Sequence, residues 1–333
     1  MSNNNKTRRD FIKEAALSSA GAGLFFNQSN ASASTTEKPN AEKSDTEESG
    51  SEKMTNCIDA HSHIWTPDIK LFPLAKGQTV KNLNPGSFTA EELMEIARPN
   101  GVNRAVLIQH HIFHGFDNSY LIHAAKQYSG TFKIVGMIDD QKPGVAQTMK
   151  NLLNQNVTGI RVLPFIRGSE NWLLGDGVQE MWTTAAETGQ NICCLINPSD
   201  LPSVNKMCEK YPDTPVVIDH FARIGGDGQI RRSDLDNLCD LAKHKKTTVK
   251  ISAYYAFGKK KPPYLDLGDM IKRLYDSFGP ERLMWASDCP YQLTGDNTYS
   301  ASINLIKEKL DFLTQNDKEW ILQKTAEKVF FSI

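Results

Sequence analysis

Two stretches decide the fold: Ile58-Asp59-Ala60-His61-Ser62-His63 and, near the end of the chain, Leu283-Met284-Trp285-Ala286-Ser287-Asp288. Each begins as an apolar run with the character of a buried β-strand and ends in polar side chains. In a strand, residues i and i+2 lie on the same face, so His61 and His63 point to one spot. If the two stretches are the first and last strands of a closed barrel, Asp288 reaches that spot as well. They therefore predict a barrel with two histidines and an aspartate at its rim.

Short apolar runs alternate with helical patterns from residue 56 onward, as expected for repeated strand–helix units. The eight runs are residues 57–61, 104–109, 133–138, 158–162, 191–196, 215–219, 247–252 and 283–287. Amphipathic patterns lie between them at 90–97, 119–128, 145–154, 178–188, 201–211, 235–244 and 267–278, and two more follow at 299–313 and 318–330. No Gly-x-Gly-x-x-Gly motif follows the first run, which disfavours a dinucleotide-binding open sheet. The sequence therefore predicts an α/β protein, a (β/α)8 TIM barrel with extra C-terminal helices.

The first 33 residues are predicted to be a targeting segment outside this fold. Thr7-Arg8-Arg9-Asp10-Phe11-Ile12-Lys13 resembles the twin-arginine export consensus, a weakly apolar stretch follows, and residues 31–33 (Ala-Ser-Ala) offer a cleavage site. Residues 34–55 are rich in Ser, Thr, Glu, Lys and Asn, which predicts a disordered linker. We expect residues 56–333 to form the barrel domain of an exported protein, periplasmic or extracellular and free of the membrane once the signal is removed.

Composition narrows the class of partner. The 333 residues carry a net charge of -1 and no basic stripe, so a small-molecule substrate is expected and nucleic acid is not. The six cysteines show no C-x-x-C spacing, which disfavours zinc bound through cysteine. Several lie in apolar runs, and we interpret them as small hydrophobic residues buried in the core. The oligomeric state is left open.

Polar side chains recur where the predicted strands end, the face at which barrel enzymes react. They are His61, His63, Gln109, His110, His111, His114, Arg161, Arg167, Asn197, Asp219, His220, Arg223, Lys250, Ser252 and Asp288. A lone histidine among them is readily explained as a core residue, but the whole set is better explained as a site. Lys250 lies within its run and is expected to pair with an acid inside the barrel. Long loops at 64–88 and 254–264 are expected to wall the pocket.

Four motifs resemble the amidohydrolase superfamily, in the branch that includes 2-pyrone-4,6-dicarboxylate lactonase and sugar lactonases. They are the Ile58–His63 stretch, Gly159-Ile160-Arg161, Val217-Ile218-Asp219-His220 and Arg282-Leu283-Met284-Trp285-Ala286-Ser287-Asp288, in the family's order. The resemblance implies a distorted barrel in which Asp288 is the general base that activates water. It also implies that His61, His63 and His220 stabilise the developing oxyanion. Arg161 and Arg167, and less strongly Arg223, suit a carboxylate on the substrate, and Gln109 and His111 are further substrate-binding candidates.

Whether a metal takes part is open at this point. His61, His63, His220 and Asp288 form a possible four-ligand zinc site, yet the lactonase branch is thought to work without metal. Many metal-dependent relatives place a histidine after strand 5, whereas residues 191–198 contain none. The run near strand 4 also lacks a lysine for a bridged two-metal centre.

Three functions remain for such a chain. The leading hypothesis is a hydrolase that opens a lactone or a related ester-like bond of a small carboxylated or sugar-derived molecule. The first alternative is a metal-dependent decarboxylase of an aromatic or unsaturated acid, and the second is a non-catalytic barrel that only binds ligand. The paired histidines together with Asp288 disfavour the last, because binding alone does not need them.

Overall fold

Eight parallel strands form one sheet in which each strand pairs with the next along the chain. The structure, a computed structural model, describes residues 55–164 and 172–333. The strands are β1 (Cys57–Ser62), β2 (Val102–Ile108), β3 (Phe132–Gly136), β4 (Val157–Val162), β5 (Asn191–Cys194), β6 (Val216–Ile218), β7 (Thr247–Ser252) and β8 (Leu283–Ala286). All eight predicted strands are present, because each is an apolar run that is buried on both faces of the sheet.

The seam between β8 and β1 is irregular. The backbone N–H of Asp288 donates to the carbonyl of His61 at 2.8 Å, and the N–H of His63 donates to the carbonyl of Cys289 at 2.8 Å. These bonds lie beyond the end of β8, and β1 itself shifts register against β2 twice. The barrel is therefore distorted where the predicted catalytic residues lie, as the resemblance implies.

The side chain of Asp59 links β1 and the end of β8 through hydrogen bonds inside the protein. Its fully buried carboxylate accepts hydrogen bonds from Ser287 N at 2.9 Å, Ser62 Oγ at 2.8 Å, His61 N at 3.1 Å and Tyr299 Oη at 3.0 Å. Donors from β1, from the end of β8 and from the following helix thus converge on one side chain. The aspartate of the first motif is a structural residue.

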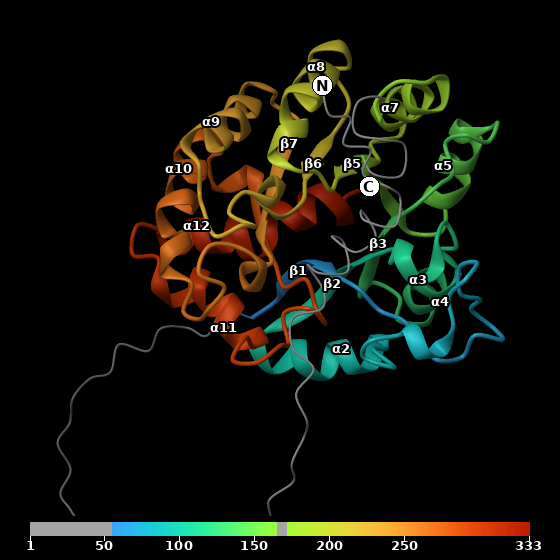
Figure 1. Ribbon diagram of the computed structural model, residues 1–333, viewed down its shortest axis with the longest axis horizontal. Coiled ribbons are helices and arrows are strands. Elements are labelled where there is room, and N and C mark those ends of the chain that lie inside the picture. Colours follow the sequence, from blue (N-terminus) through green and yellow to red (C-terminus); the bar gives the residue numbers. More distant parts are fainter. Residues whose placement is uncertain (1–54, 165–171) are drawn as a thin grey trace, which may run out of the picture. The chain divides into compact units, whose positions relative to one another are not determined.

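The helices surround the strands in sequence order (Figure 1). They are α2 (Ala90–Ala97), α3 (His111–His114), α4 (Ser119–Gln127), α5 (Val145–Leu153), α7 (Asp176–Thr188), α8 (Leu201–Lys210), α9 (Arg232–Asp240), α10 (Gly268–Phe278), α11 (Tyr299–Asn304) and α12 (Gln315–Glu319). The seven predicted helices between strands agree with α2, α4, α5 and α7–α10 to within a few residues. The short α3 was not predicted. Within the described ranges, no helix has the length and apolar character that crossing a membrane requires.

The C-terminal segment closes the end of the barrel opposite the site. The two predicted closing helices are interrupted: α11 continues as a π-helical turn at Leu305–Lys309, and π-helical turns at Trp320–Lys324 and Glu327–Phe331 follow α12. Phe330 is fully buried and belongs to the interior cluster of the strands. Arg104 on β2 holds this segment through a 2.9 Å ion pair with Glu327.

The predicted signal peptide (residues 1–33) and the predicted linker up to residue 54 lie outside the described residues. Both assignments, and the domain boundary at residue 56, stay predictions. The six cysteines are all free thiols, and all but Cys239 are buried, in keeping with their interpretation as small hydrophobic residues.

Candidate active site

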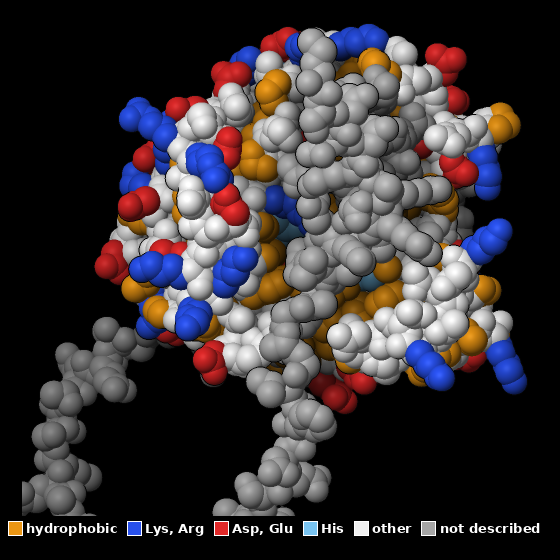
Figure 2. Space-filling model, viewed as in Figure 1, with side chains coloured by type: hydrophobic (Ala, Val, Ile, Leu, Met, Phe, Trp, Pro, Cys, Tyr) orange, Lys and Arg blue, Asp and Glu red, His pale blue; other side chains and the backbone are white. Residues whose placement is uncertain are grey.

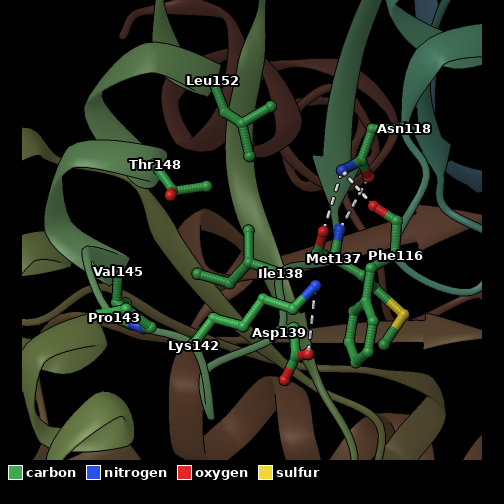
Figure 3. Close-up of a pocket in the computed structure, with 10 residues that line it drawn as sticks. All are labelled: Phe116, Asn118, Met137, Ile138, Asp139, Lys142, Pro143, Val145, Thr148 and Leu152. Carbon is green, nitrogen blue, oxygen red and sulfur yellow. Dashed lines mark hydrogen bonds and ion pairs between the residues drawn. The ribbon is translucent and has the colours of Figure 1, made fainter.

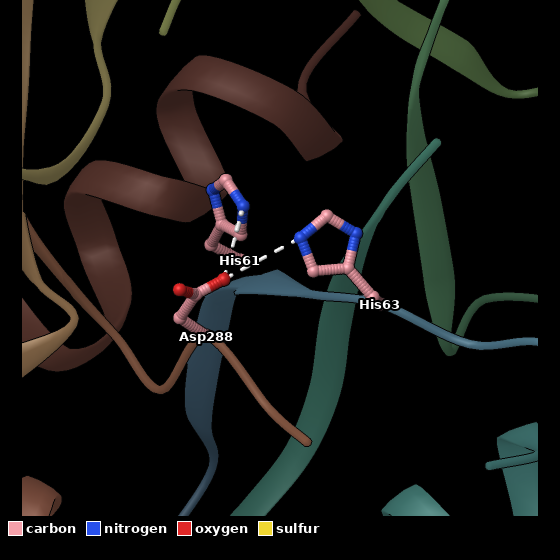
Figure 4. Close-up of side chains that lie close together, drawn as sticks. All are labelled: His61, His63 and Asp288. Atoms are coloured by element: carbon pink, nitrogen blue, oxygen red, sulfur yellow. Dashed lines mark ion pairs between the residues drawn. The ribbon is translucent and has the colours of Figure 1, made fainter. Parts of the chain in front are cut away.

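The site is centred on one oxygen of Asp288, which follows β8. Asp288 Oδ1 lies 3.4 Å from His63 Nε2, 3.5 Å from His61 Nε2 and 3.9 Å from His220 Nε2. Figure 4 shows the imidazole of His61 on β1 and that of His63, just after this strand, converging with the carboxylate of Asp288. The structure therefore brings together the four residues that the sequence analysis proposed as catalytic.

The backbone bends sharply where these side chains leave the strands. His220 after β6, Ala253 after β7 and Asp288 after β8 have φ values of 51°, 58° and 62°, in the left-handed region that non-glycine residues seldom adopt. Each such residue costs of the order of 1–3 kcal/mol, and such strain clusters at functional sites. Two of these three residues, His220 and Asp288, belong to the site and approach each other to 3.9 Å.

The other oxygen of Asp288 has a separate partner. Tyr255 Oη donates to Asp288 Oδ2 at 2.6 Å, which leaves Oδ1 to face the imidazoles. Although burial raises the pKa of Asp288, His220, His63 and His61 more than offset this and hold it below its usual value. Asp288 is therefore an ionised carboxylate with one oxygen fixed and one directed into the site.

Two of the imidazoles are oriented by hydrogen bonds through Nδ1. His63 Nδ1 lies 2.9 Å from the carbonyl oxygen of Ile108, and since a carbonyl only accepts, Nδ1 carries the proton. His220 Nδ1 lies 2.8 Å from Ser252 Oγ. Burial lowers the pKa of His220 to about 4, so this imidazole is neutral near pH 7.

Beneath His61 lies a buried cluster of charges. Lys250 Nζ is 3.0 Å from Asp219 Oδ1 and 3.2 Å from His61 Nδ1, and Arg161 Nε is 3.7 Å from Asp219 Oδ2. The expected pairing of Lys250 with an acid inside the barrel is confirmed. Burial raises the pKa of Asp219, but Lys250, His61 and Arg161 outweigh it, and the pKa lies well below the usual range. Asp219 is thus an anion held between two cations.

A second group of aromatic side chains borders His63. His110 Nδ1 accepts from the backbone N–H of Phe113 at 3.3 Å, so its neutral ring carries the proton on Nε2. That N–H donates to Tyr291 Oη, whose own hydrogen is then directed elsewhere. The ring centroids of Tyr291 and His63 are 5.8 Å apart. Neither Tyr255 nor Tyr291 was predicted as a site residue, because they lie in loops after β7 and β8 and no strand pattern marks them. Tyr255 falls within the 254–264 loop that was expected to wall the pocket.

The residues predicted to bind substrate lie in different environments and make different contacts. Arg161 is buried beside Asp219, and Arg223 donates to Asn197 Oδ1 at 3.4 Å. Burial, followed by Arg161 and other cations, lowers the pKa of His111 to about 3. Gln109 is fully buried and its amide donates to the carbonyl of Asp117, a contact that fixes the loop after β2. Arg167 lies outside the described residues, and the roles of all five in binding stay predictions.

A metal ion fits part of this donor set. His61, His63 and Asp288 each offer one ligand atom, and these atoms lie within 4.8 Å of one another. His63 Nε2 faces Asp288 Oδ1 at 3.4 Å, and in the neutral ring with its proton on Nδ1 both atoms are acceptors, so a cation or a proton between them relieves the contact. Within the described residues, the buried His61 Nε2 has no hydrogen-bond partner.

Figure 2 shows small areas of His and of Lys or Arg surface among hydrophobic side chains on the face viewed. A separate cavity of about 350 Å³ lies beside β3 and α5 (Figure 3). Its lining is largely apolar, with Phe116, Ile138 and Val145, and an ion pair of 3.7 Å between Asp139 and Lys142. It contains none of the imidazoles described above.

The sequence profile described as amidohydrolase matches residues 58–331. The chain belongs to the amidohydrolase family. This match covers the whole barrel, and the predicted family and enzyme class, an amidohydrolase-type hydrolase, are confirmed.

Two relatives of this amidohydrolase have named activities. An L-fucono-1,5-lactonase of Burkholderia ambifaria is 24% identical over 241 residues, 71% of this chain and 81% of the relative. A 4-sulfomuconolactone hydrolase of Rhizobium radiobacter is 24% identical over 238 residues, 70% of this chain and 75% of the relative.

Solved structures share the fold. An amidohydrolase of Burkholderia multivorans with bound zinc superposes with a TM-score of 0.70 at 15% identity, covering 83% of this chain and 99% of its own. The 5-carboxyvanillate decarboxylase of Sphingomonas paucimobilis gives a TM-score of 0.59 at 10% identity, covering 83% and 99%. At these identities the similarity establishes the barrel and not the reaction.

Proposed function

We propose that this amidohydrolase opens a lactone or a related ester-like bond, with Asp288 as the general base. The observation that carries the proposal is the position of Asp288 Oδ1, buried, ionised and within 3.9 Å of three imidazole nitrogens. Oδ1 is free to take a proton from a water molecule that attacks the carbonyl carbon. The proton then passes to the oxygen that leaves when the ring opens.

The tetrahedral oxyanion needs donors or positive charge close by. His61, His63 and His220 surround the place where it would form, and preorganised donors supply much of the rate enhancement in acyl transfer. A ring whose proton is on Nδ1, as in His63, takes part only when Nε2 is also protonated or holds a metal ion. A divalent ion such as zinc would be held by His61, His63 and Asp288, with His220 as a fourth candidate, and when bound would polarise the substrate carbonyl.

A small anionic or sugar-derived substrate suits the surrounding charges. Arg161 and Arg223 lie near the site, and each influences the protonation of His111. A guanidinium pairs with a carboxylate through two hydrogen bonds. The two named relatives act on a sugar lactone and a sulfonated lactone, which supports the same class of substrate here.

The experiment that tests this proposal is the Asp288→Asn substitution, assayed on a panel of lactones with a pH indicator. Because the amide cannot accept the proton of water, we expect turnover to fall by about 10³-fold or more while ligand binding survives. Asp139→Asn, which alters a carboxylate at the separate cavity, should leave turnover unchanged. Full activity of Asp288→Asn would contradict the proposal. Release of carbon dioxide from aromatic acids would favour the alternative, a metal-dependent decarboxylase.

We also infer that the protein is exported by the twin-arginine route. The inference rests on Arg8 and Arg9 within the consensus-like stretch. Replacing both by lysine should retain the protein in the cytoplasm, as measured by cell fractionation. Unchanged export would contradict it.

A further inference from the structure

Lys250 contacts the catalytic histidine His61 from below. Its Nζ lies 3.2 Å from His61 Nδ1 in hydrogen-bonding geometry. Its contact with Asp219 Oδ1 is shorter, 3.0 Å, and joins two opposite charges. Lys250, Asp219 and His61 are all fully buried, so bulk water does not compete for these contacts.

The direction of the hydrogen bond follows from the chemistry of the two groups. A lysine ammonium has three donors and no acceptor, so His61 Nδ1 must accept. A neutral imidazole with an acceptor at Nδ1 carries its proton on Nε2. The competing acceptor for a proton on Nδ1, Asp219 Oδ1, is farther away at 3.6 Å.

The other histidine of the same motif has the opposite arrangement. His63 Nδ1 faces the carbonyl oxygen of Ile108 at 2.9 Å, so its proton is on Nδ1 and its Nε2 presents a lone pair. The two imidazoles that flank Asp288 Oδ1 are therefore not equivalent. His61 presents an N–H to the site, and His63 presents an acceptor.

We propose that Lys250 is a positioning residue that fixes His61 as the Nε2–H tautomer, so that His61 acts as a hydrogen-bond donor in the site. The proposal deepens the proposed function but depends only on the resting protein.

The Nε2–H tautomer of His61 also affects metal binding, because His61 Nε2 can ligate a metal only after its proton moves to Nδ1. In that tautomer the hydrogen bond from Lys250 is lost and Asp219 must accept instead. Lys250 therefore weakens metal binding through His61.

The direct test is nitrogen-15 NMR of the metal-free wild-type protein labelled at histidine. The chain has eight histidines, and the resonances of His61 are assigned by their loss in His61→Asn. We expect His61 Nε2 to show the shift of a protonated nitrogen and Nδ1 that of an unprotonated one, with the reverse for His63. A proton on Nδ1 of His61 would overturn the proposal, and this measurement requires no variant at Lys250.

The second test is zinc affinity measured by calorimetry. In Lys250→Met the proton of His61 is expected to move to Nδ1, toward Asp219, and zinc should bind about 10- to 100-fold more tightly. Arg161→Met is the matched control, because it removes a positive charge beside the same carboxylate without touching His61 Nδ1. An equal gain in zinc affinity in both variants would show that the loss of a positive charge alone strengthens zinc binding. That result would contradict the proposed role of Lys250. Loss of activity in Asp288→Asn tests the proposed function separately, because the tautomer and the zinc affinity are measured in proteins that keep Asp288.

Discussion

Tyr255 gives the two carboxylate oxygens of Asp288 different roles, because it bonds only one of them. Its hydroxyl donates to Oδ2 at 2.6 Å, and this bond leaves Oδ1 as the oxygen that faces the imidazoles. Burial, and then the charge of Asp288, raises the pKa of Tyr255 well above its ordinary value, so the group stays a donor throughout the working pH range. Tyr255 is therefore a positioning residue for the general base.

We predict that Tyr255→Phe lowers kcat/KM by about 10- to 100-fold, because a hydrogen bond to a charged group contributes about 1.5–3 kcal/mol. The carboxylate remains but can rotate, so the loss should be smaller than for Asp288→Asn. Tyr254→Phe is the control, since its buried hydroxyl bonds the backbone carbonyl of Ile251 at 3.0 Å, away from the carboxylate. Steady-state kinetics on the same lactone decides the matter, and wild-type kcat/KM in Tyr255→Phe would refute the assignment.

At the scale of the element, the contacts between β8 and β1 both stabilise the barrel and position the catalytic residues. The donors on Asp59 hold the seam together, and the same seam carries the hydrogen bond between the backbones of Asp288 and His61. A displacement of β8 against β1 would therefore move the general base relative to the imidazoles.

We predict that Asp59→Asn lowers the free energy of unfolding by about 2–4 kcal/mol, since an amide turns one of the two acceptor oxygens into a donor that faces other donors. Urea unfolding measures the loss. Asp68→Asn, at an exposed aspartate of the loop after β1, should change stability by less than about 0.5 kcal/mol. Equal stability of Asp59→Asn and the wild type would show that the seam does not depend on this carboxylate.

The elements were largely predictable from the sequence, and the contacts of the site only partly. Parallel strands buried on both faces are continuous apolar runs, so their number and order could be read directly, as could the polar residues that follow them. The π-helical turns after α11 and α12 were not predicted, because they keep the apolar pattern of a helix. Tyr255 and Tyr291 were missed since their positions depend on how loops fold over the barrel, which no local pattern records.

At the scale of the whole molecule, the barrel interior is a stack of layers. Phe330 closes the lower end, with Lys250 Nζ 5.3 Å from its ring centroid, and the charged cluster, the imidazoles and Asp288 follow toward the opposite end. Several histidines in this interior are neutral because burial disfavours their charged form. Burial lowers the pKa of His61 and His110 well below the ordinary value, and lowers that of His220 to about 4.

This arrangement predicts acid destabilisation that starts above the range in which carboxylates titrate. A histidine whose folded pKa is depressed binds its proton in the unfolded chain near pH 6.5, so stability is complete above that pH and falls as the pH drops toward the folded value. For His220, with a folded pKa of about 4, the window is pH 6.5 down to about 4. Within its window, each such histidine makes the free energy of unfolding fall by about 1.4 kcal/mol per pH unit as the pH is lowered. Urea unfolding of metal-free protein between pH 8 and pH 5 should give an unfolding free energy whose pH dependence corresponds to more than one proton, and His220→Gln should reduce that number by about one. His123→Gln, at an exposed position of α4, is the control. A free energy of unfolding that stays constant from pH 8 to pH 5 would mean that the interior histidines are charged in the folded protein.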